Sequence, residues 1–163
     1  SFLENIDYQG KLTKQLPAYS QRVVYTTSGT KLCACFLEDS THIIDTKLYW
    51  VRVDGKEEGH YLAALLNSNV VQDQVRGMQS LGLFGPRDFH TLPLNLPIQR
   101  FDRNVPQHRL LAELGARAAN LVRSLEIDEP ESFVKARKIV QLELTKELQG
   151  QIDDVAAETL GNS

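Results

Sequence analysis

The pattern of apolar and polar positions divides the chain into three parts, and the first, residues 1–53, is typical of β-structure. Residues 22–26 form a β-branched run that ends at a Ser-Gly turn, and residues 31–37 resume as a nearly continuous apolar run. We therefore expect these two runs to form a hairpin, with residues 42–44 as a short third strand. Residues 47–53 are the strongest strand candidate, and their large side chains on both faces predict a central position in the sheet.

The second part, residues 54–81, has the periodicity of two short helices. Asp54 and Glu57 have the spacing of a capping box, which predicts that the first helix opens there. Its apolar residues are expected to face the sheet: Tyr61, Leu62, Leu65 and Leu66. Residues 67–69, Asn-Ser-Asn, interrupt the pattern. The second helix then places three apolar residues on one side: Val71, Val75 and Met78.

The third part begins at Pro106 and has the periodicity of long helices. A sustained apolar stripe marks the first of them: Leu110, Leu111, Leu114, Ala118, Leu121, Val122 and Leu125. Residues 128–131, Asp-Glu-Pro-Glu, predict the start of the next helix, and Gly150 is expected to break it. Two amphipathic helices joined by a short link predict an antiparallel hairpin.

Residues 82–105 follow neither a helical nor a strand period, and their glycines and prolines predict a long ordered loop. The expected fold is therefore α+β, with a small, mainly antiparallel sheet, covering helices, this loop and the C-terminal helical hairpin. We place the boundary between an α/β domain, residues 1–105, and the helical hairpin, residues 106–163.

The charge of the chain is unevenly distributed. The 163 residues carry a formal net charge of -3, yet residues 76–109 hold five arginines and only two acidic residues. The rest of the chain then has thirteen basic against nineteen acidic side chains. A positive segment in an acidic chain suits a surface that faces phosphate, because the other faces repel nucleic acid. The competing interpretation is a set of ordinary solvated loop arginines.

Cys33 and Cys35 are the only cysteines, and their spacing suits neither a strain-free disulfide nor a four-ligand zinc site. We expect buried, reduced thiols in a cytoplasmic protein. The sequence has no secretory signal and no apolar run long enough to span a bilayer, so no membrane partner is expected. Because the chain starts at Ser1, we expect it to be a piece of a longer protein.

Sequence motifs of catalysis are missing from the chain. It has no nucleophile elbow, Walker loop, zincin motif or dinucleotide fingerprint, and its four histidines lack metal-ligand spacing. Asp88 and His90 are close enough in sequence to pair, and in a loop such a pair is expected to be a local brace. The sequence thus offers features for binding without a reaction centre.

Five residues are the candidate DNA-binding residues. Arg87 and His90 are expected to contact a base or phosphate, and Lys31, Lys47 and Arg100 to contact phosphates. The turn at residues 27–30 adds hydroxyl and backbone donors beside Lys31. Two aromatic residues near the arginines, Phe89 and Phe101, could wedge between bases or anchor the loop on the core.

The order of several segments resembles one family. The segments are residues 7–16, 22–29, 44–50, 61–68, 85–90, 96–102 and 108–112, including a Leu-Asn-Ser helix end and an Arg-Asp-Phe-His loop. Together they resemble the C-terminal region of bacterial and archaeal adenine-specific DNA methyltransferases of the restriction-modification type. That region is similar to a target-recognition domain and follows the catalytic domain. The resemblance covers residues 5–115.

The resemblance implies that the chain binds double-stranded DNA beside a methyltransferase domain of the same protein. Members of the family carry a glycine-rich cofactor motif and an Asn-Pro-Pro-aromatic motif, and neither occurs here. We therefore expect no cofactor and no catalysis in this chain, and S-adenosylmethionine in the parent protein. The alternative is a protein-interaction module that docks a partner through its acidic C-terminal helices.

Overall fold

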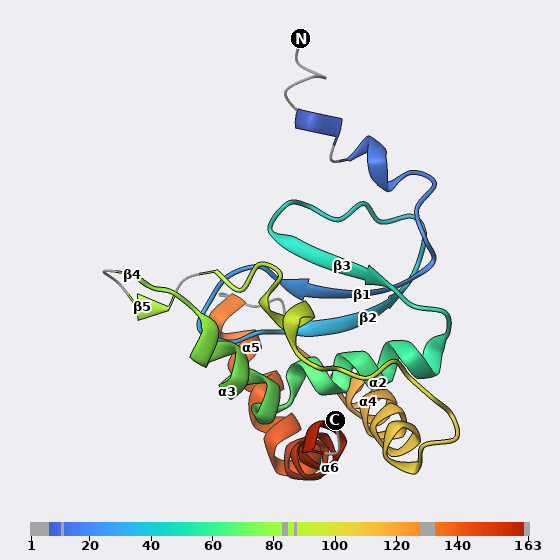
Figure 1. Cartoon of the computed structure of the whole chain (residues 1–163), viewed down its shortest axis with the longest axis vertical. Coiled ribbons are helices and arrows are strands. Elements are labelled where there is room, and N and C mark those ends of the chain that lie inside the picture. Colours follow the sequence, from blue (N-terminus) through green and yellow to red (C-terminus); the bar gives the residue numbers. More distant parts are fainter. Residues whose placement is uncertain (1–6, 11, 83–84, 87, 128–132, 162–163) are drawn as a thin grey trace.

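The computed structural model describes residues 7–10, 12–82, 85–86, 88–127 and 133–161. Its strands are β1 (Gln21–Thr26), β2 (Ala34–Glu38), β3 (Leu48–Arg52), β4 (Leu81–Gly82) and β5 (Gly85–Pro86). Its α-helices are α2 (Lys56–Asn67), α3 (Asn69–Met78), α4 (Pro106–Ser124), α5 (Phe133–Leu144) and α6 (Gly150–Gly161). Short 3-10 turns are η1 (Tyr8–Gly10), η2 (Thr13–Gln15) and η3 (Leu92–Asn95), and η4 (Thr145–Gln149) is π-helical. The predicted α+β class is confirmed (Figure 1).

The main sheet has three antiparallel strands in the order β2-β1-β3. The predicted β1–β2 hairpin is confirmed, whereas the central position predicted for residues 47–53 is wrong. β1 takes the centre because its four inner residues are buried, while Leu48 and Tyr49 leave β3 partly exposed at an edge. Residues 42–44 do not form a strand. There Ile44 is held instead by the side chain of Gln15, which accepts its N–H and donates to its carbonyl, both at 2.8 Å.

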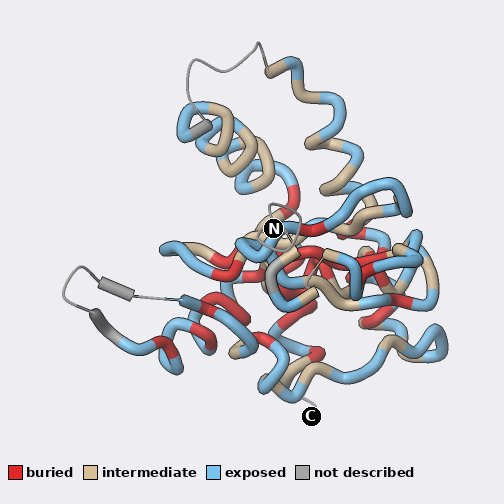
Figure 2. Tube along the Cα trace, turned by 90° about the horizontal axis from the view of Figure 1, so that it is seen from above, coloured by how far each residue is buried: buried red, intermediate tan, exposed pale blue. Residues whose placement is uncertain are grey.

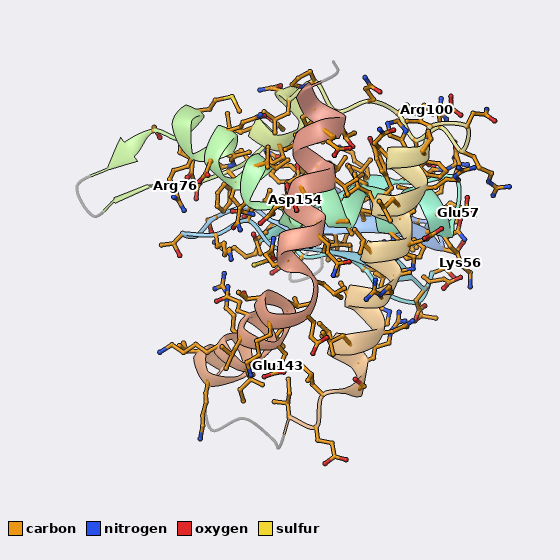
Figure 3. The ribbon with its side chains drawn as sticks, turned by 90° about the horizontal axis from the view of Figure 1, so that it is seen from below. Lys56, Glu57, Arg76, Arg100, Glu143 and Asp154 are labelled. Carbon is orange, nitrogen blue, oxygen red and sulfur yellow. The ribbon has the colours of Figure 1, made fainter. Side chains whose placement is uncertain are left out.

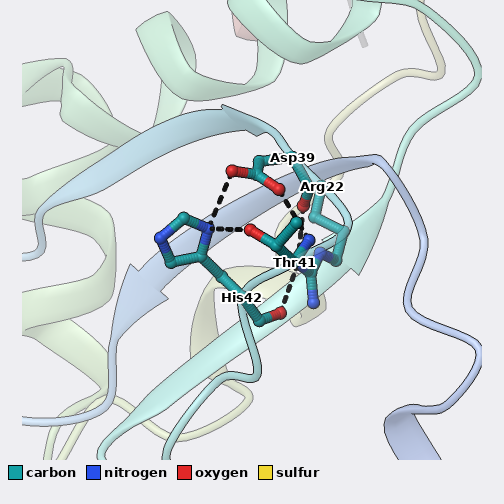
Figure 4. A network of polar contacts seen from close by, with 4 residues as sticks. All are labelled: Arg22, Asp39, Thr41 and His42. Atoms are coloured by element: carbon teal, nitrogen blue, oxygen red, sulfur yellow. Dashed lines mark hydrogen bonds and ion pairs between the residues drawn. The ribbon is translucent and has the colours of Figure 1, made fainter.

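The face of the sheet opposite the helices is fixed by a buried arginine. Arg22 of β1 donates through Nη2 to the carbonyls of Asp39 and His42, at 2.9 and 2.7 Å (Figure 4). The Asp39 carboxylate in turn contacts His42 Nδ1 at 3.0 Å and accepts the N–H of Thr41. The guanidinium group also lies 5.8 Å from the ring centroid of Trp50. These contacts hold the loop between β2 and β3 against the sheet.

Helix α2 lies between the sheet and the C-terminal helices (Figure 1). The prediction that all four of its large residues face the sheet is only partly right. Leu66 packs with Val23 in the sheet core, whereas Tyr61 and Leu65 pack with Leu111 in a second core formed with α4 and α6. A helix that is buried on two sides has apolar residues on both, so the spacing of its apolar residues does not show which side faces the sheet.

The start of α2 differs from the predicted capping box. The helix begins at Lys56 after Gly55, and no side chain caps it. The Glu58 carboxylate accepts the N–H of Asp54 at 2.6 Å. Only one of the two hydrogen bonds of a capping box is therefore present, and it is made by Glu58 instead of the predicted Glu57. The Asp54 carboxylate is left available for an ion pair elsewhere. The end of α2 agrees with prediction: Ser68 interrupts the pattern and caps α3 by accepting the Val71 N–H.

The C-terminal region forms the predicted helical hairpin, with one correction. α4 and α5 stand side by side, away from the buried centre of the molecule (Figure 2). Gly150 does not break the second helix, because it keeps helical angles of -60° and -45°. The change of direction between α5 and α6 instead coincides with the π-helical turn η4 (Figure 3). The helix start predicted at residues 128–131 lies outside the described residues.

Candidate nucleic-acid interface

One end of the main sheet brings together three segments that are distant in sequence. The Thr27 carbonyl accepts the N–H groups of Phe89 and His90 at 2.7 and 3.2 Å. The Thr27 N–H and hydroxyl both donate to the Lys47 carbonyl, at 3.3 and 2.9 Å. Figure 1 shows the segment that follows β5 passing beside the ends of β1 and β3. We call residues 27–31, Lys47 and residues 88–90 the sheet-end cluster.

Lys31 is positioned by the turn that joins β1 to β2. Gly29 has φ of +128°, a left-handed conformation that favours glycine, so the turn needs this residue there. On the other side of Lys31, Leu32 is buried, and its N–H and C=O both pair with the side chain of Gln72 at 2.8 Å. The lysine is therefore held between a tight turn and an anchored core residue.

The loop segment of the cluster is anchored by Phe89. Its side chain is 2% exposed and belongs to the sheet core with Val71 and Val75. The Tyr25 hydroxyl donates to the His90 carbonyl at 3.2 Å. Burial raises the pKa of Tyr25 to about 12, so this donor keeps its proton at neutral pH. His90 itself has φ of +43°, which a non-glycine residue adopts only where its surroundings hold it.

The predicted Asp88–His90 pair is present in the cluster. A carboxylate oxygen of Asp88 lies 3.1 Å from His90 Nε2, and the histidine side chain is 62% exposed. Phe89 between them points into the core, so both polar side chains face outward. The pair therefore fixes an exposed imidazole in one orientation, which agrees with the predicted brace.

An arginine that the sequence analysis did not single out lies close to this cluster. Arg137 of α5 reaches back to Cys33, the residue before β2, where its Nη2 contacts Sγ at 3.4 Å, two residues from Lys31. Lys135, Arg137 and Lys138 form a short basic run in a tail that is otherwise rich in acidic residues. This basic run is the sequence feature from which Arg137 could have been proposed as a binding residue. Only the packing of α5 shows that it lies near the sheet.

The acidic groups near the cluster already have partners. Asp45 accepts the backbone N–H and the hydroxyl of Thr46, and Asp88 contacts His90. Lys47 is exposed, Lys31 is half-buried, and within the described part of the chain neither forms an ion pair. Their ammonium groups are therefore available to an external anion.

Arg100 lies at the opposite end of the sheet from this cluster. Its guanidinium forms an ion pair of 2.7 Å with Asp54, which follows β3, whereas Lys47 precedes that strand. Arg103 pairs similarly with Glu57 at 2.8 Å beside the start of α2. Figure 3 labels Arg100 and Glu57. The segments that carry Lys31, Lys47 and His90 are thus joined at one end of the sheet, and Arg100 lies at the other. Arg87 lies outside the described residues.

Both candidate phenylalanines anchor the loop, so neither is a free wedge for bases. Phe101 is half-buried and packs on Tyr61 and His108, with ring centroids 5.5 and 6.3 Å away. His108 is buried and accepts the Asp102 N–H through Nδ1 at 3.0 Å. An exposed aromatic group two residues from Lys47 is Tyr49 of β3, whose ring stacks on Tyr25 at 5.8 Å.

The described residues contain no group of three or more His, Cys, Asp or Glu residues that could hold a metal ion. No helix in this part of the chain is long and apolar enough to cross a membrane. Comparison of the sequence with protein-family models and curated proteins, and of the fold with solved structures, gives no match.

Proposed function

We propose that this chain is the DNA target-recognition region of an adenine-specific DNA methyltransferase of a restriction-modification or phage-defence system. In this proposal it binds double-stranded DNA and does not act as an enzyme alone. The resemblance of residues 5–115 to that family motivates the proposal. The observation that supports it is the sheet-end cluster, where hydrogen bonds of Thr27 join the three separate segments that carry Lys31, Lys47 and His90.

The cluster has the chemistry that a DNA backbone requires. Lys31 and Lys47 offer ammonium groups without carboxylate partners in the described chain, and the turn at residues 27–30 offers hydroxyl groups. Arg137 adds a guanidinium group from α5. Phosphate contacts of this kind supply affinity and register, while base contacts supply specificity. Arg87, which lies outside the described residues, and Arg100 remain candidate contacts from the sequence alone.

Methyl transfer is assigned to a separate domain. The chain lacks both the glycine-rich motif for S-adenosylmethionine and the Asn-Pro-Pro-aromatic motif that grips the target adenine. The purified chain is therefore expected to transfer no methyl group from S-adenosylmethionine to duplex DNA. Methylation by the chain alone would contradict this division of labour.

The proposal is tested by measuring duplex affinity as a function of salt. The wild-type chain should bind a fluorescent duplex with a negative slope of log affinity against log salt concentration. The double variant Lys31→Ala, Lys47→Ala should reduce the magnitude of that slope by about 2, since each phosphate contact contributes about 0.9.

A matched variant controls for net charge. Arg109→Ala with Arg117→Ala removes the same two charges from exposed positions of α4, which α2 separates from the sheet. Its slope should equal that of the wild type. Equal losses in both double variants would indicate a nonspecific charge effect, and no salt-dependent binding by the wild type would overturn the proposal.

Docking of a protein through the C-terminal helices is the second candidate function. Three large apolar residues of α5 are exposed, which favours it: Val134, Ile139 and Leu142. The measurement of duplex affinity against salt concentration distinguishes the two functions. A module that only docks protein should show no salt-dependent affinity for duplex DNA.

A further inference from the structure

We propose that His90 reads one base of the DNA target by accepting a hydrogen bond from an exocyclic amino group, N6 of adenine or N4 of cytosine. This inference rests on the proposed function and deepens it. It assigns a specificity-determining contact to one atom, His90 Nδ1, and leaves affinity to Lys31 and Lys47.

The first argument is that the backbone of His90 is fixed on every side. Its N–H donates to Thr27, its carbonyl accepts from the Tyr25 hydroxyl, and the preceding Phe89 is sealed in the core. The residue is held in a left-handed conformation with φ of +43°. Exposed loop side chains seldom have this much support, and a rigid contact loses little entropy when it binds.

The second argument concerns the proton on the imidazole. The Asp88 carboxylate, 3.1 Å from Nε2, can only accept a hydrogen bond, so it favours the tautomer with the proton on Nε2. In the neutral ring Nδ1 then carries the lone pair. Among the residues that the structure describes, no group makes a hydrogen bond to Nδ1, and the side chain is exposed. His90 therefore presents an acceptor to the outside.

The third argument concerns the other outward side chains of the cluster. Lys31 and Lys47 can only donate, and the hydroxyls of Ser28 and Thr30 can donate or accept without distinguishing bases. The other acceptor of the cluster, the Asp88 carboxylate, contacts His90 Nε2 through one oxygen. In the major groove adenine and cytosine offer amino donors, whereas guanine and thymine offer carbonyl acceptors. A fixed acceptor therefore selects for adenine or cytosine.

The test is selection of binding sites from a pool of duplexes with randomised positions. The wild type should show at least one position at which adenine or cytosine is preferred by about 5- to 100-fold. In His90→Ala the ratio of affinities for the preferred and other bases at this position should fall towards one, while preferences at other positions remain. His90→Asn is the second variant, because asparagine tolerates a left-handed backbone and protects against misfolding. Its amide can both accept and donate, so a preference for cytosine should weaken, whereas a preference for adenine should persist because asparagine can bond both N6 and N7 of that base.

Two further variants separate specificity from affinity. Asp88→Asn lets the side chain at position 88 donate as well as accept, so it removes the demand for a proton on Nε2 and should weaken the same base preference. Lys47→Ala should lower affinity for all sequences equally and leave every preference intact.

The possible outcomes distinguish this inference from the proposed function. If the wild-type chain binds no duplex, both fail. If it binds but His90→Ala lowers affinity for all sequences equally or changes nothing, His90 is no base reader and only the inference fails. Loss of a preference for guanine or thymine would likewise overturn it, because those bases present acceptors at the major-groove edge.

Discussion

Gly115 sets how closely helices α2 and α4 approach. A Cβ atom at this position would lie 2.3 Å from the backbone carbonyl oxygen of His60 and 3.3 Å from the Ala64 Cβ. The oxygen belongs to the helix backbone, so it cannot turn away as a side chain can. The contact between the two helices therefore depends on the absence of a side chain here.

We predict that Gly115→Ala lowers the free energy of unfolding by about 1–3 kcal/mol, because α2 and α4 must move apart. Urea denaturation followed by circular dichroism measures the change. Gly150→Ala is the matched control, since it is helical with open space around its Cβ position. That variant should be neutral or more stable by about 0.5–1 kcal/mol. Equal effects at both glycines would contradict the close approach.

His108 makes stability depend on pH. Burial lowers its pKa, with the Asp102 carboxylate acting in the opposite direction, and Nδ1 must stay unprotonated to accept the Asp102 N–H. The unfolded state holds the proton more tightly than the folded state, so acid favours unfolding. The contribution is fully present above the unfolded pKa of about 6.5 and is lost as pH falls through the lower folded value.

We therefore predict that the unfolding free energy of the wild type decreases between pH 7.5 and 5, and that His108→Asn decreases less. Asparagine can still accept the Asp102 N–H but does not titrate in this range. The pKa of His60 is also lowered by burial, so only the difference between the two proteins measures His108. Parallel pH profiles in urea denaturation would refute the assignment.

The junction of α2 and α3 is joined to the sheet by amide side chains. Asn67 accepts the Ala34 N–H at 3.0 Å and donates to the Ala34 carbonyl at 2.7 Å, as a neighbouring strand would. It also donates to the Ala63 carbonyl at 2.9 Å. Gln72 forms the same pair of bonds with Leu32. The Leu-Asn-Ser pattern thus ends one helix, starts the next and extends the hydrogen bonding of β2.

We predict that Asn67→Ala lowers the unfolding free energy by about 1–3 kcal/mol, because the N–H and carbonyl of Ala34 lose their partner. Thermal and urea denaturation measure the loss, and hydrogen exchange at the Ala34 amide should accelerate. Asn120→Ala on the exposed side of α4 removes only a contact with Arg123 and should cost nothing. An unchanged stability in Asn67→Ala would show that water replaces the side chain.

Most helices and strands could be predicted from local patterns, but the elements that each one packs against could not. The β-branched runs predicted β1 and β2 as a hairpin, and Ser68 predicted the break between α2 and α3. The period of residues 47–53 could not distinguish a central strand from an edge strand, because Trp50 is covered by Tyr19 from a distant segment. The predicted helix break at Gly150 is wrong because a glycine ends a helix only where the flanking residues do not stabilise it.

The whole molecule is built around a helix that two cores share. Leu66 of α2 belongs to the core with the sheet, and Tyr61, Ala64 and Leu65 belong to the core with α4 and α6. Removing either core would expose one buried side of α2. The boundary that the sequence predicts after residue 105 is therefore crossed by apolar contacts.

We predict that the sheet and the helices unfold in one transition. Trp50, the only tryptophan, reports on β3, whereas far-ultraviolet circular dichroism reports mainly on the helices. Urea curves from the two signals should coincide within error. Leu111→Ala, which opens a cavity in the core away from the sheet, should shift both midpoints equally. Separate transitions would support two independent domains.

The sequence by itself determined the α+β class and most helices and strands, because side-chain periodicity and turn chemistry are local properties. Lys31, Lys47 and His90 are candidates that it proposes. Only the tertiary structure decided that the segments of these three residues are joined at one end of the sheet, that Arg100 is paired with Asp54 at the other, and that Arg137 approaches from α5. Strand order and long-range contacts depend on which surfaces the whole chain buries together, and no local pattern encodes that choice.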